Sequence, residues 1–251
     1  AEVVVVDAEA RLEEIGAVAG EARAETLREA AARHRVARER AVGESRALEL
    51  ARAFLFQADM ALPACVAELG GERSVGGAAR GGAEPQSLHE TLFFARQAPL
   101  DSECADLAVP PVLTANRSVL VGDNEESGPS RHLQPHVLRA RPRRKPAFVA
   151  FVPSELFLNQ GCHEAESAST GDGLSTHDLK LGFPQLFANL EVVRAHTVDE
   201  AVRAASRPER ANGNARLIAT VGGDSVDVEV QAGDRRCILL RTVHVRSRIT
   251  S

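Results

Sequence analysis

Serine stands close to aspartate at two places in the sequence, one of which also contains a histidine, and such residues could supply nucleophilic catalysis. Residues 173–178 read Gly-Leu-Ser-Thr-His-Asp, and residues 223–225 read Gly-Asp-Ser. A serine nucleophile needs a base within reach and a strained turn that exposes its hydroxyl group. Neither phrase completes a known nucleophile motif, so neither predicts a serine hydrolase site.

Cysteine and histidine form two further clusters that could do chemistry. Cys162, His163 and Glu164 place a thiol beside a potential base, as cysteine nucleophiles require. Side chains of neighbouring residues often point apart, so a loop cluster without a site is the preferred interpretation. His132 and His136 have the spacing of a metal-binding pair, but the proline between them argues against the helix that would align both ligands.

Two carboxylates share one face of a predicted strand near the end of the chain. Asp227 and Glu229 alternate with valines over residues 226–230, and carboxylates on one strand face could ligate a divalent metal. The plainer interpretation is pairing across the hairpin with the arginines that follow, at positions 235, 236 and 241. We prefer the pairing.

Basic residues are concentrated in residues 131–145, where no acidic residue occurs. The segment contains Arg131, Arg139, Arg141, Arg143, Arg144 and Lys145. Such a loop could hold a phosphate, a carboxylate or a nucleic-acid backbone. It could equally be solvated or neutralised by nearby acids such as Glu125 and Glu126.

A second basic segment lies near the start of the chain. Residues 26–40 resemble the helix-turn-helix of sigma-factor C-terminal regions. Arg35 occupies the turn position at which that motif usually has glycine. A solvated helix face rich in arginine and glutamate is the default interpretation, and DNA binding is the alternative.

Composition excludes several classes of function. The 251 residues carry a formal net charge of -5, which does not indicate a nucleic-acid partner. Trp and Tyr are absent and Phe occurs nine times, which removes the usual platforms for base stacking. The four cysteines are far apart, so neither a zinc ribbon nor a redox dithiol is predicted. Separate thiols and the lack of a long apolar run favour a cytoplasmic protein without a membrane partner.

The elements that must position these residues are clearest at the end of the chain. Residues 216–221, 226–230 and 235–248 predict three strands in meander order, joined at Gly-rich turns. Residues 45–62 and 197–205 predict helices, 147–152 a central strand covered on both faces, and 187–193 a strand. Residues 122–125 predict a turn, and 159–173 a loop.

These elements predict one α+β domain over residues 1–251. We expect a helical N-terminal third, residues 1–70, packed on a mixed, mostly antiparallel β-sheet or β-roll. Asp7 is the expected N-cap of the first helix, which would follow a short strand over residues 2–6. Residues 71–146 would form a loop-rich part with short strands, and residues 147–251 a β-rich part.

Several phrases, taken in chain order, resemble the hydratase and decarboxylase branch of the fumarylacetoacetate hydrolase superfamily. They span residues 75–251 and include 91–95 (Thr-Leu-Phe-Phe-Ala), 122–125 (Gly-Asp-Asn-Glu), 133–135 (Leu-Gln-Pro), 190–193 (Leu-Glu-Val-Val), 217–220 (Leu-Ile-Ala-Thr) and 232–234 (Ala-Gly-Asp). The resemblance implies action on a 2-hydroxy-dienoate or 2-keto acid. It also implies a Mg²⁺ or Mn²⁺ cofactor that is chelated by the 2-oxo acid end of the substrate.

Residues 137–141 depart from that pattern. The family has two glutamates after the Gln-Pro phrase, where this chain reads Val-Leu-Arg-Ala-Arg. Glu191 is therefore the only matching metal ligand, and the family lysine expected near residues 77–80 is missing too. Either the chain has lost activity, or other acids take over ligation, such as Glu125, Glu126, Asp227 and Glu229.

The leading hypothesis is a metal-dependent lyase, or an inactive relative of one. Glu191 would hold the metal, and Arg131 and Arg139 would bind a small anionic substrate. We also expect a homo-oligomer. The alternative hypothesis is an anion-binding or nucleic-acid-binding protein that uses residues 131–145 or 26–40.

Overall fold

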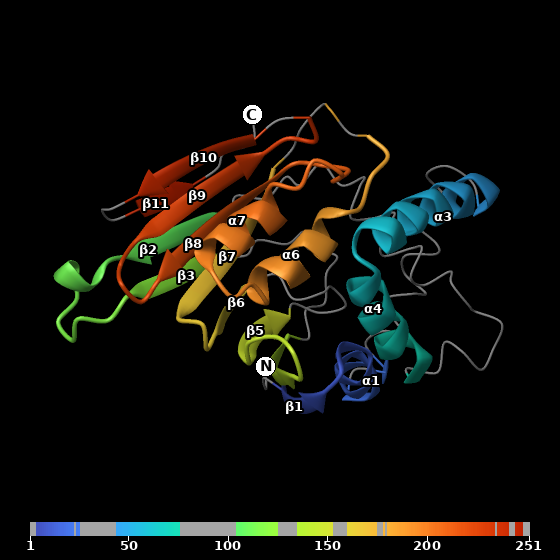
Figure 1. Cartoon of the computed structure of the whole chain (residues 1–251), viewed down its shortest axis with the longest axis horizontal. Coiled ribbons are helices and arrows are strands. Elements are labelled where there is room, and N and C mark those ends of the chain that lie inside the picture. The colour runs from blue at the N-terminus through green and yellow to red at the C-terminus, as the bar shows by residue number, and fades with distance from the viewer. Residues whose placement is uncertain are drawn as a thin grey trace.

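The computed structural model consists mainly of two β-sheets, with helices against one face of the larger sheet (Figure 1). It describes residues 4–22, 24–25, 44–75, 104–124, 135–152, 160–174, 178, 180–233, 235–240 and 244–247. Residues 26–40 and Arg131 lie outside this part of the chain, so the helix-turn-helix prediction and the predicted role of Arg131 stay predictions.

The larger sheet has eight strands in the order β1-β4-β5-β6-β7-β8-β9-β10. Their bounds are β1 Val4–Ala10, β4 His136–Pro142, β5 Phe148–Val152, β6 Gln160–His163, β7 Ser167–Gly173, β8 Asn214–Thr220, β9 Ser225–Val230 and β10 Arg235–Leu240. β1 is parallel to β4, and the other neighbouring pairs are antiparallel. The predicted meander at the end of the chain is confirmed as β8, β9 and β10, but the third strand is shorter than the predicted 235–248, because residues 244–247 form a separate strand of the other sheet.

A second, three-stranded sheet packs on one face of the larger sheet. It has the order β11-β2-β3, with bounds β11 His244–Ser247, β2 Ala105–Val109 and β3 Leu120–Asn124. A short 3-10 helix, η2 (Pro111–Leu113), lies between β2 and β3 in the chain. Ala108 packs with Leu217 and Ala219 of β8, so an apolar layer joins the two sheets.

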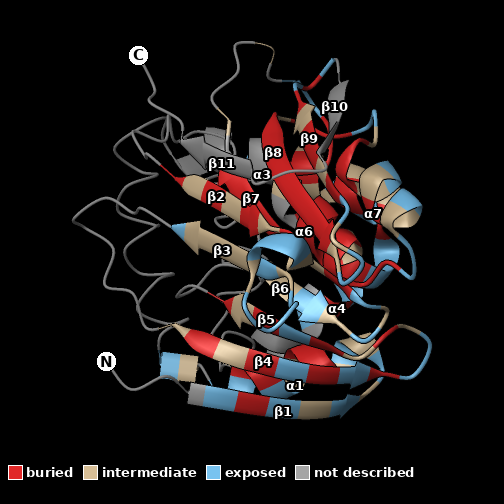
Figure 2. Ribbon diagram, turned by 90° about the vertical axis from the view of Figure 1, so that its left-hand side faces the viewer, coloured by how far each residue is buried: buried red, intermediate tan, exposed pale blue. Residues whose placement is uncertain are grey.

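Helices cover the opposite face of the larger sheet. They are α1 (Leu12–Ala22), α3 (Glu44–Ala61), α4 (Pro63–Val75), α6 (Gln185–Val193) and α7 (Val198–Ala205). Ile218 packs with residues of α6 and α7, whereas its neighbours Leu217 and Ala219 face the second sheet. Figure 2 accordingly shows β8 and β9 between α7 on one side and β2 on the other. None of the helices in the described ranges is long and apolar enough to cross a bilayer.

The predicted helical N-terminal third packed on one sheet or β-roll is wrong. The first described element is β1, a strand of the larger sheet, and two sheets with few helices dominate the described part of the chain. Alternation explains the long strand, because Val6 is buried while Val5, Asp7 and Glu9 are exposed. Asp7 is therefore a strand residue and not a helix cap.

Glu14 caps α1 instead. Its carboxylate accepts a hydrogen bond from the backbone N–H of Arg11, at 2.9 Å, and forms an ion pair with the guanidinium of the same arginine, at 2.7 Å. This is one half of a capping box, in which a glutamate in the first turn satisfies a free N–H group at the helix start.

Other elements also differ from prediction. Residues 185–193 form helix α6 rather than a strand, because Phe187 and Leu190 pack into the core beneath the helix. Much of the basic segment forms β4 rather than a loop, and β6 and β7 form a hairpin where a loop was predicted. Residues 122–124 belong to β3 rather than to a turn. In each case, tertiary packing overrides local propensity.

The predictions that residues 45–62 and 197–205 are helical are confirmed by α3 and α7. Thr197 caps α7, since its side chain accepts a hydrogen bond from the backbone N–H of Glu200 at 3.2 Å. The predicted strand at 147–152 is also present as β5. It is not covered on both faces, because Val149 is 40% exposed.

Candidate functional site

Three aspartates from three strands converge between the two sheets. Asp106 lies on β2, Asp123 on β3 and Asp172 on β7, and each offers a carboxylate oxygen within 4.8 Å of the others. Asp106 is 1% exposed and Asp172 is fully buried, whereas Asp123 is half-buried. We call these three residues the aspartate cluster.

Strand register explains the convergence. Asp106 and Asp123 are direct partners in the antiparallel β2–β3 pair, so their side chains share one face of the small sheet. Asp106 also shares that face with Ala108, which packs against β8. Asp172 completes the cluster from the larger sheet, so the site exists only because the two sheets are stacked.

Charge makes this arrangement suited to a cation. Carboxylates this close repel one another, and burial strengthens the repulsion. Arg246 on β11 is the register partner of Asp106. Hard divalent cations prefer oxygen ligands such as these carboxylates.

Sequence reasoning missed this cluster because its aspartates lie in phrases typical of turns. Asp123 is in Gly-Asp-Asn and Asp172 in Gly-Asp-Gly, and both phrases are strand residues in the structure. The sequence of residues 105–109, Ala-Asp-Leu-Ala-Val, alternates so that Leu107 and Val109 would be expected to face inward, whereas the structure buries Asp106 and Ala108. No local sequence signal therefore indicated an inward aspartate.

Glu191, the predicted metal ligand, lies elsewhere, on the helix side of the larger sheet. It is half-buried on α6, and the thiol of Cys65 on α4 donates a hydrogen bond to its Oε1 atom at 3.4 Å. Burial, together with the neighbouring acids Glu191 and Glu68, raises the pKa of the Cys65 thiol. Glu191 is not part of the aspartate cluster, and its role as a metal ligand stays a prediction.

An ion pair lies next to Glu191. Arg194 Nη2 is 2.5 Å from the Glu68 carboxylate, and the arginine is fully buried. The guanidinium carbon also lies 5.4 Å from the centre of the Phe148 ring, within the range of a cation–π contact. Both interactions tie α4 and α6 to β5.

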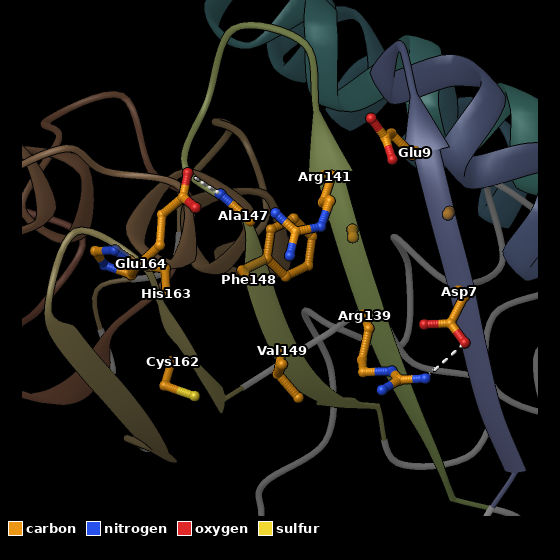
Figure 3. A pocket seen from close by; sticks show the side chains of 12 residues that line it. Asp7, Glu9, Arg139, Arg141, Ala147, Phe148, Val149, Cys162, His163 and Glu164 are labelled. Carbon is orange, nitrogen blue, oxygen red and sulfur yellow. Dashed lines mark hydrogen bonds and ion pairs between the residues drawn. The ribbon is translucent and has the colours of Figure 1, made fainter.

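Arg139, the predicted substrate-binding residue, lines a groove of about 690 Å³ on the other face of the sheet. The groove crosses β1, β4, β5 and β6, away from the helices (Figure 3). Arg139 forms an exposed ion pair with Asp7 at 2.7 Å. Arg141 lines the same groove, so β4 presents two guanidinium groups on this face.

The Cys162 and His163 side chains point to opposite faces of β6, as expected for neighbours in a strand. Cys162 is exposed in the groove, whereas His163 pairs with Ser167, whose Oγ lies 2.7 Å from its Nε2. Burial, with a contribution from His196, lowers the pKa of His163. The two neighbours therefore do not form a thiol–imidazole pair.

The remaining sequence candidates are not brought together in the described part of the chain. His136 is buried on β4, whereas His132 and His177 lie outside the described residues. Asp178 accepts a hydrogen bond from the backbone N–H of Gly233 at 2.8 Å. Glu229 is the register partner of Arg236 across the β9–β10 hairpin, the arrangement that the pairing interpretation requires.

Comparison with known proteins gives little further guidance. No family model and no curated protein matches the sequence. Among solved structures, the chain is similar to penicillin V acylase from Agrobacterium tumefaciens, with 15% sequence identity and a TM-score of 0.32. The match covers 59% of this chain and 46% of the acylase, so this chain spans less than half of the acylase. A likeness of this size does not establish a shared fold or activity.

Proposed function

We propose that this protein binds a divalent cation, Mg²⁺ or Mn²⁺, through Asp106, Asp123 and Asp172. The observation that carries the proposal is the approach of three carboxylate oxygens to within 4.8 Å of one another, two of them on buried residues. Oxygen-only ligation suits hard cations, and their charge would relieve the repulsion among the carboxylates.

The cation would supply Lewis-acid chemistry to a small anionic substrate. Mg²⁺ usually keeps several coordination positions for water or substrate, and two oxygens of a 2-keto or 2-hydroxy acid could occupy two of these positions. A cation that holds those oxygens polarises the carbonyl group. The family resemblance supports a hydratase or decarboxylase reaction of this kind, with the metal moved from Glu191 to the aspartate cluster.

Calorimetric titration of the metal-free protein with Mn²⁺ tests the binding step. We expect Asp172→Asn to weaken binding by at least about tenfold, because one charged ligand becomes a neutral one. Asp59→Asn, on the exposed side of α3, is the matched control and should leave binding unchanged. Equal binding by wild type and Asp172→Asn would refute the aspartate cluster as the site.

Glu191→Gln separates the two metal hypotheses. If the aspartate cluster holds the cation, this variant binds Mn²⁺ as the wild type does. If Glu191 is the ligand, as the family resemblance implies, Glu191→Gln loses binding while Asp172→Asn retains it.

The lyase reaction needs a separate measurement. Wild type and Asp172→Asn, each with the same Mn²⁺ concentration, should differ in the rate at which they consume a 2-keto acid or a 2-hydroxy-dienoate. Because free Mn²⁺ promotes the same reaction in both samples, the difference between the two rates measures the reaction at the aspartate cluster. Equal rates would leave a cation-binding protein without this activity.

Two other expectations stay predictions. Light scattering during size-exclusion chromatography tests the homo-oligomer. A salt titration of duplex DNA binding tests the nucleic-acid alternative, because affinity based on phosphate contacts falls steeply as salt rises.

A further inference from the structure

We infer that the groove over β1, β4, β5 and β6 binds a monocarboxylate with an apolar body, and that Arg141 holds its carboxylate. We call this the sheet groove. Its volume of about 690 Å³ is typical of small-molecule sites. The inference goes beyond the proposed cation site and does not depend on it.

Arg141 is the cation that is available to a ligand. It is exposed, and among the described residues it forms no hydrogen bond or ion pair. Its register partner on β1 is Glu9. Figure 3 shows the guanidinium extended away from Glu9, toward β5. A planar guanidinium in this position can bind a carboxylate through two parallel hydrogen bonds.

Arg139 is less available, although it lies on the same face of β4. Its guanidinium points toward β1, where it pairs with Asp7 at 2.7 Å (Figure 3). This pair is exposed, so it is weak and can be broken. Arg139 is thus a reserve donor that Asp7 holds away from the ligand.

The charge of the lining selects a ligand with a single negative charge. Asp7, Glu9 and Glu164 face only two arginines, and the lowered pKa of His163 keeps that ring neutral at physiological pH. The Glu164 carboxylate also accepts a hydrogen bond from the backbone N–H of Ala147, at 2.9 Å. The net negative lining repels every anion, but it repels a phosphate or dicarboxylate more strongly than a monocarboxylate, whose single charge can pair with Arg141.

The far side of the groove offers apolar surface. Val149 is 40% exposed, and its register partner on β6 is the exposed Cys162. Neighbouring strands lie about 4.8 Å apart, so these side chains extend the groove by roughly 10 Å from β4. A short hydrocarbon chain attached to the carboxylate would cover both.

The sheet groove is separate from the aspartate cluster, although both lie on one face of the larger sheet. Cys162 is the register partner of Ala168, and Asp172 is four residues further along β7. Four strand residues correspond to roughly 13 Å. A small ligand held by Arg141 would not reach the cluster.

Titration with sodium hexanoate, followed by NMR shifts of backbone amides, tests the inference. We expect shifts confined to β1, β4, β5 and β6, and roughly tenfold weaker binding in Arg141→Gln, which loses a charge-assisted contact. Arg144→Gln is the matched control, because that arginine is exposed beyond the groove lining. It should bind hexanoate as the wild type does.

Asp7→Asn distinguishes a binding role from a merely structural one. It frees Arg139 and removes a negative charge, so hexanoate should bind several-fold more tightly. Equal weakening by Arg141→Gln and Arg144→Gln would overturn the inference, as would equally tight binding of 1-hexanol. Binding should persist in EDTA and in Asp172→Asn, so failure of the cation site and failure of the sheet groove are distinguishable.

Discussion

The two faces of the larger sheet hold charged side chains in opposite ways. On the helix face, Arg194 pairs with Glu68, and both side chains are almost fully buried. On the other face, Arg139 pairs with Asp7, and the two side chains are 57% and 66% exposed. Breaking a buried pair leaves an unpaired charge without water, whereas an exposed pair contributes little. Loss of one partner should therefore be costly on the helix face and nearly neutral on the other face.

The largest effect should come from Arg194→Met. Glu68 would stay buried near Glu191 without its guanidinium, and the contact with Phe148 would be lost. We expect the free energy of unfolding to fall by about 3–5 kcal/mol. Urea denaturation measures the change.

The double variant Glu68→Leu/Arg194→Met is the control for that prediction. It removes both charges, so we expect it to recover much of the lost stability. A single variant as stable as the wild type would show that the pair is not buried in solution.

Gly16→Ala should have the next largest effect, because Gly16 of α1 packs directly against the backbone of α4. A Cβ atom at position 16 would collide with the backbone carbonyl of Glu68, which cannot move as a side chain could. We expect a loss of about 1–3 kcal/mol or more in the free energy of unfolding.

Gly70→Ala is the matched control in α4. A Cβ atom there meets nothing within 4 Å, so the variant should be neutral or about 0.5–1 kcal/mol more stable. Equal losses in both variants would contradict close packing at Gly16.

His163→Gln should have a smaller effect, which depends on pH. The pKa of His163 is lowered from its ordinary value of 6.5, mainly by burial. As pH falls, His163 therefore takes up its proton more readily in the unfolded chain than in the folded protein. The contribution of His163 to the free energy of unfolding is fully present above pH 6.5 and decreases below it.

Melting temperatures at about pH 7.5 and about pH 5.5 check this prediction. Nearby Glu164 and His196 remain in the variant. The difference in melting temperature should be smaller in His163→Gln than in the wild type. His196→Gln should keep most of the difference. An unchanged difference in His163→Gln would contradict the assignment.

The smallest effect should come from Arg139→Gln. Its ion pair with Asp7 is exposed on both sides, so we expect a change below about 1 kcal/mol in the free energy of unfolding. A loss as large as that of Arg194→Met would mean that the Arg139–Asp7 pair is as important for stability as the buried Arg194–Glu68 pair.

Regular patterns made part of the fold predictable. Valines alternating with Asp227 and Glu229 indicate a strand whatever surrounds it, and Thr197 marks the start of α7 through a local hydrogen bond. Such features depend on residues close in sequence, so the sequence alone suffices to find them.

The candidate site was not predictable in the same way. Asp106, Asp123 and Asp172 become neighbours only through the stacking of two sheets, and no local pattern encodes that contact. The helix α6 was missed because Phe187, Val192 and Val193 favour strands intrinsically, while packing against the sheet selects a helix. Long-range contacts decide both outcomes.

The last two strands follow one another in the chain but belong to different sheets. β10 is the final strand of the larger sheet in the described order, whereas β11 pairs with β2 in the smaller one. A chain shortened to end at Leu240 would keep every strand of the larger sheet and leave β2 and β3 as a lone hairpin, which is marginally stable in water. Asp106 would then sit on an open sheet edge, so the integrity of the aspartate cluster depends on four residues more than a hundred positions away in the sequence.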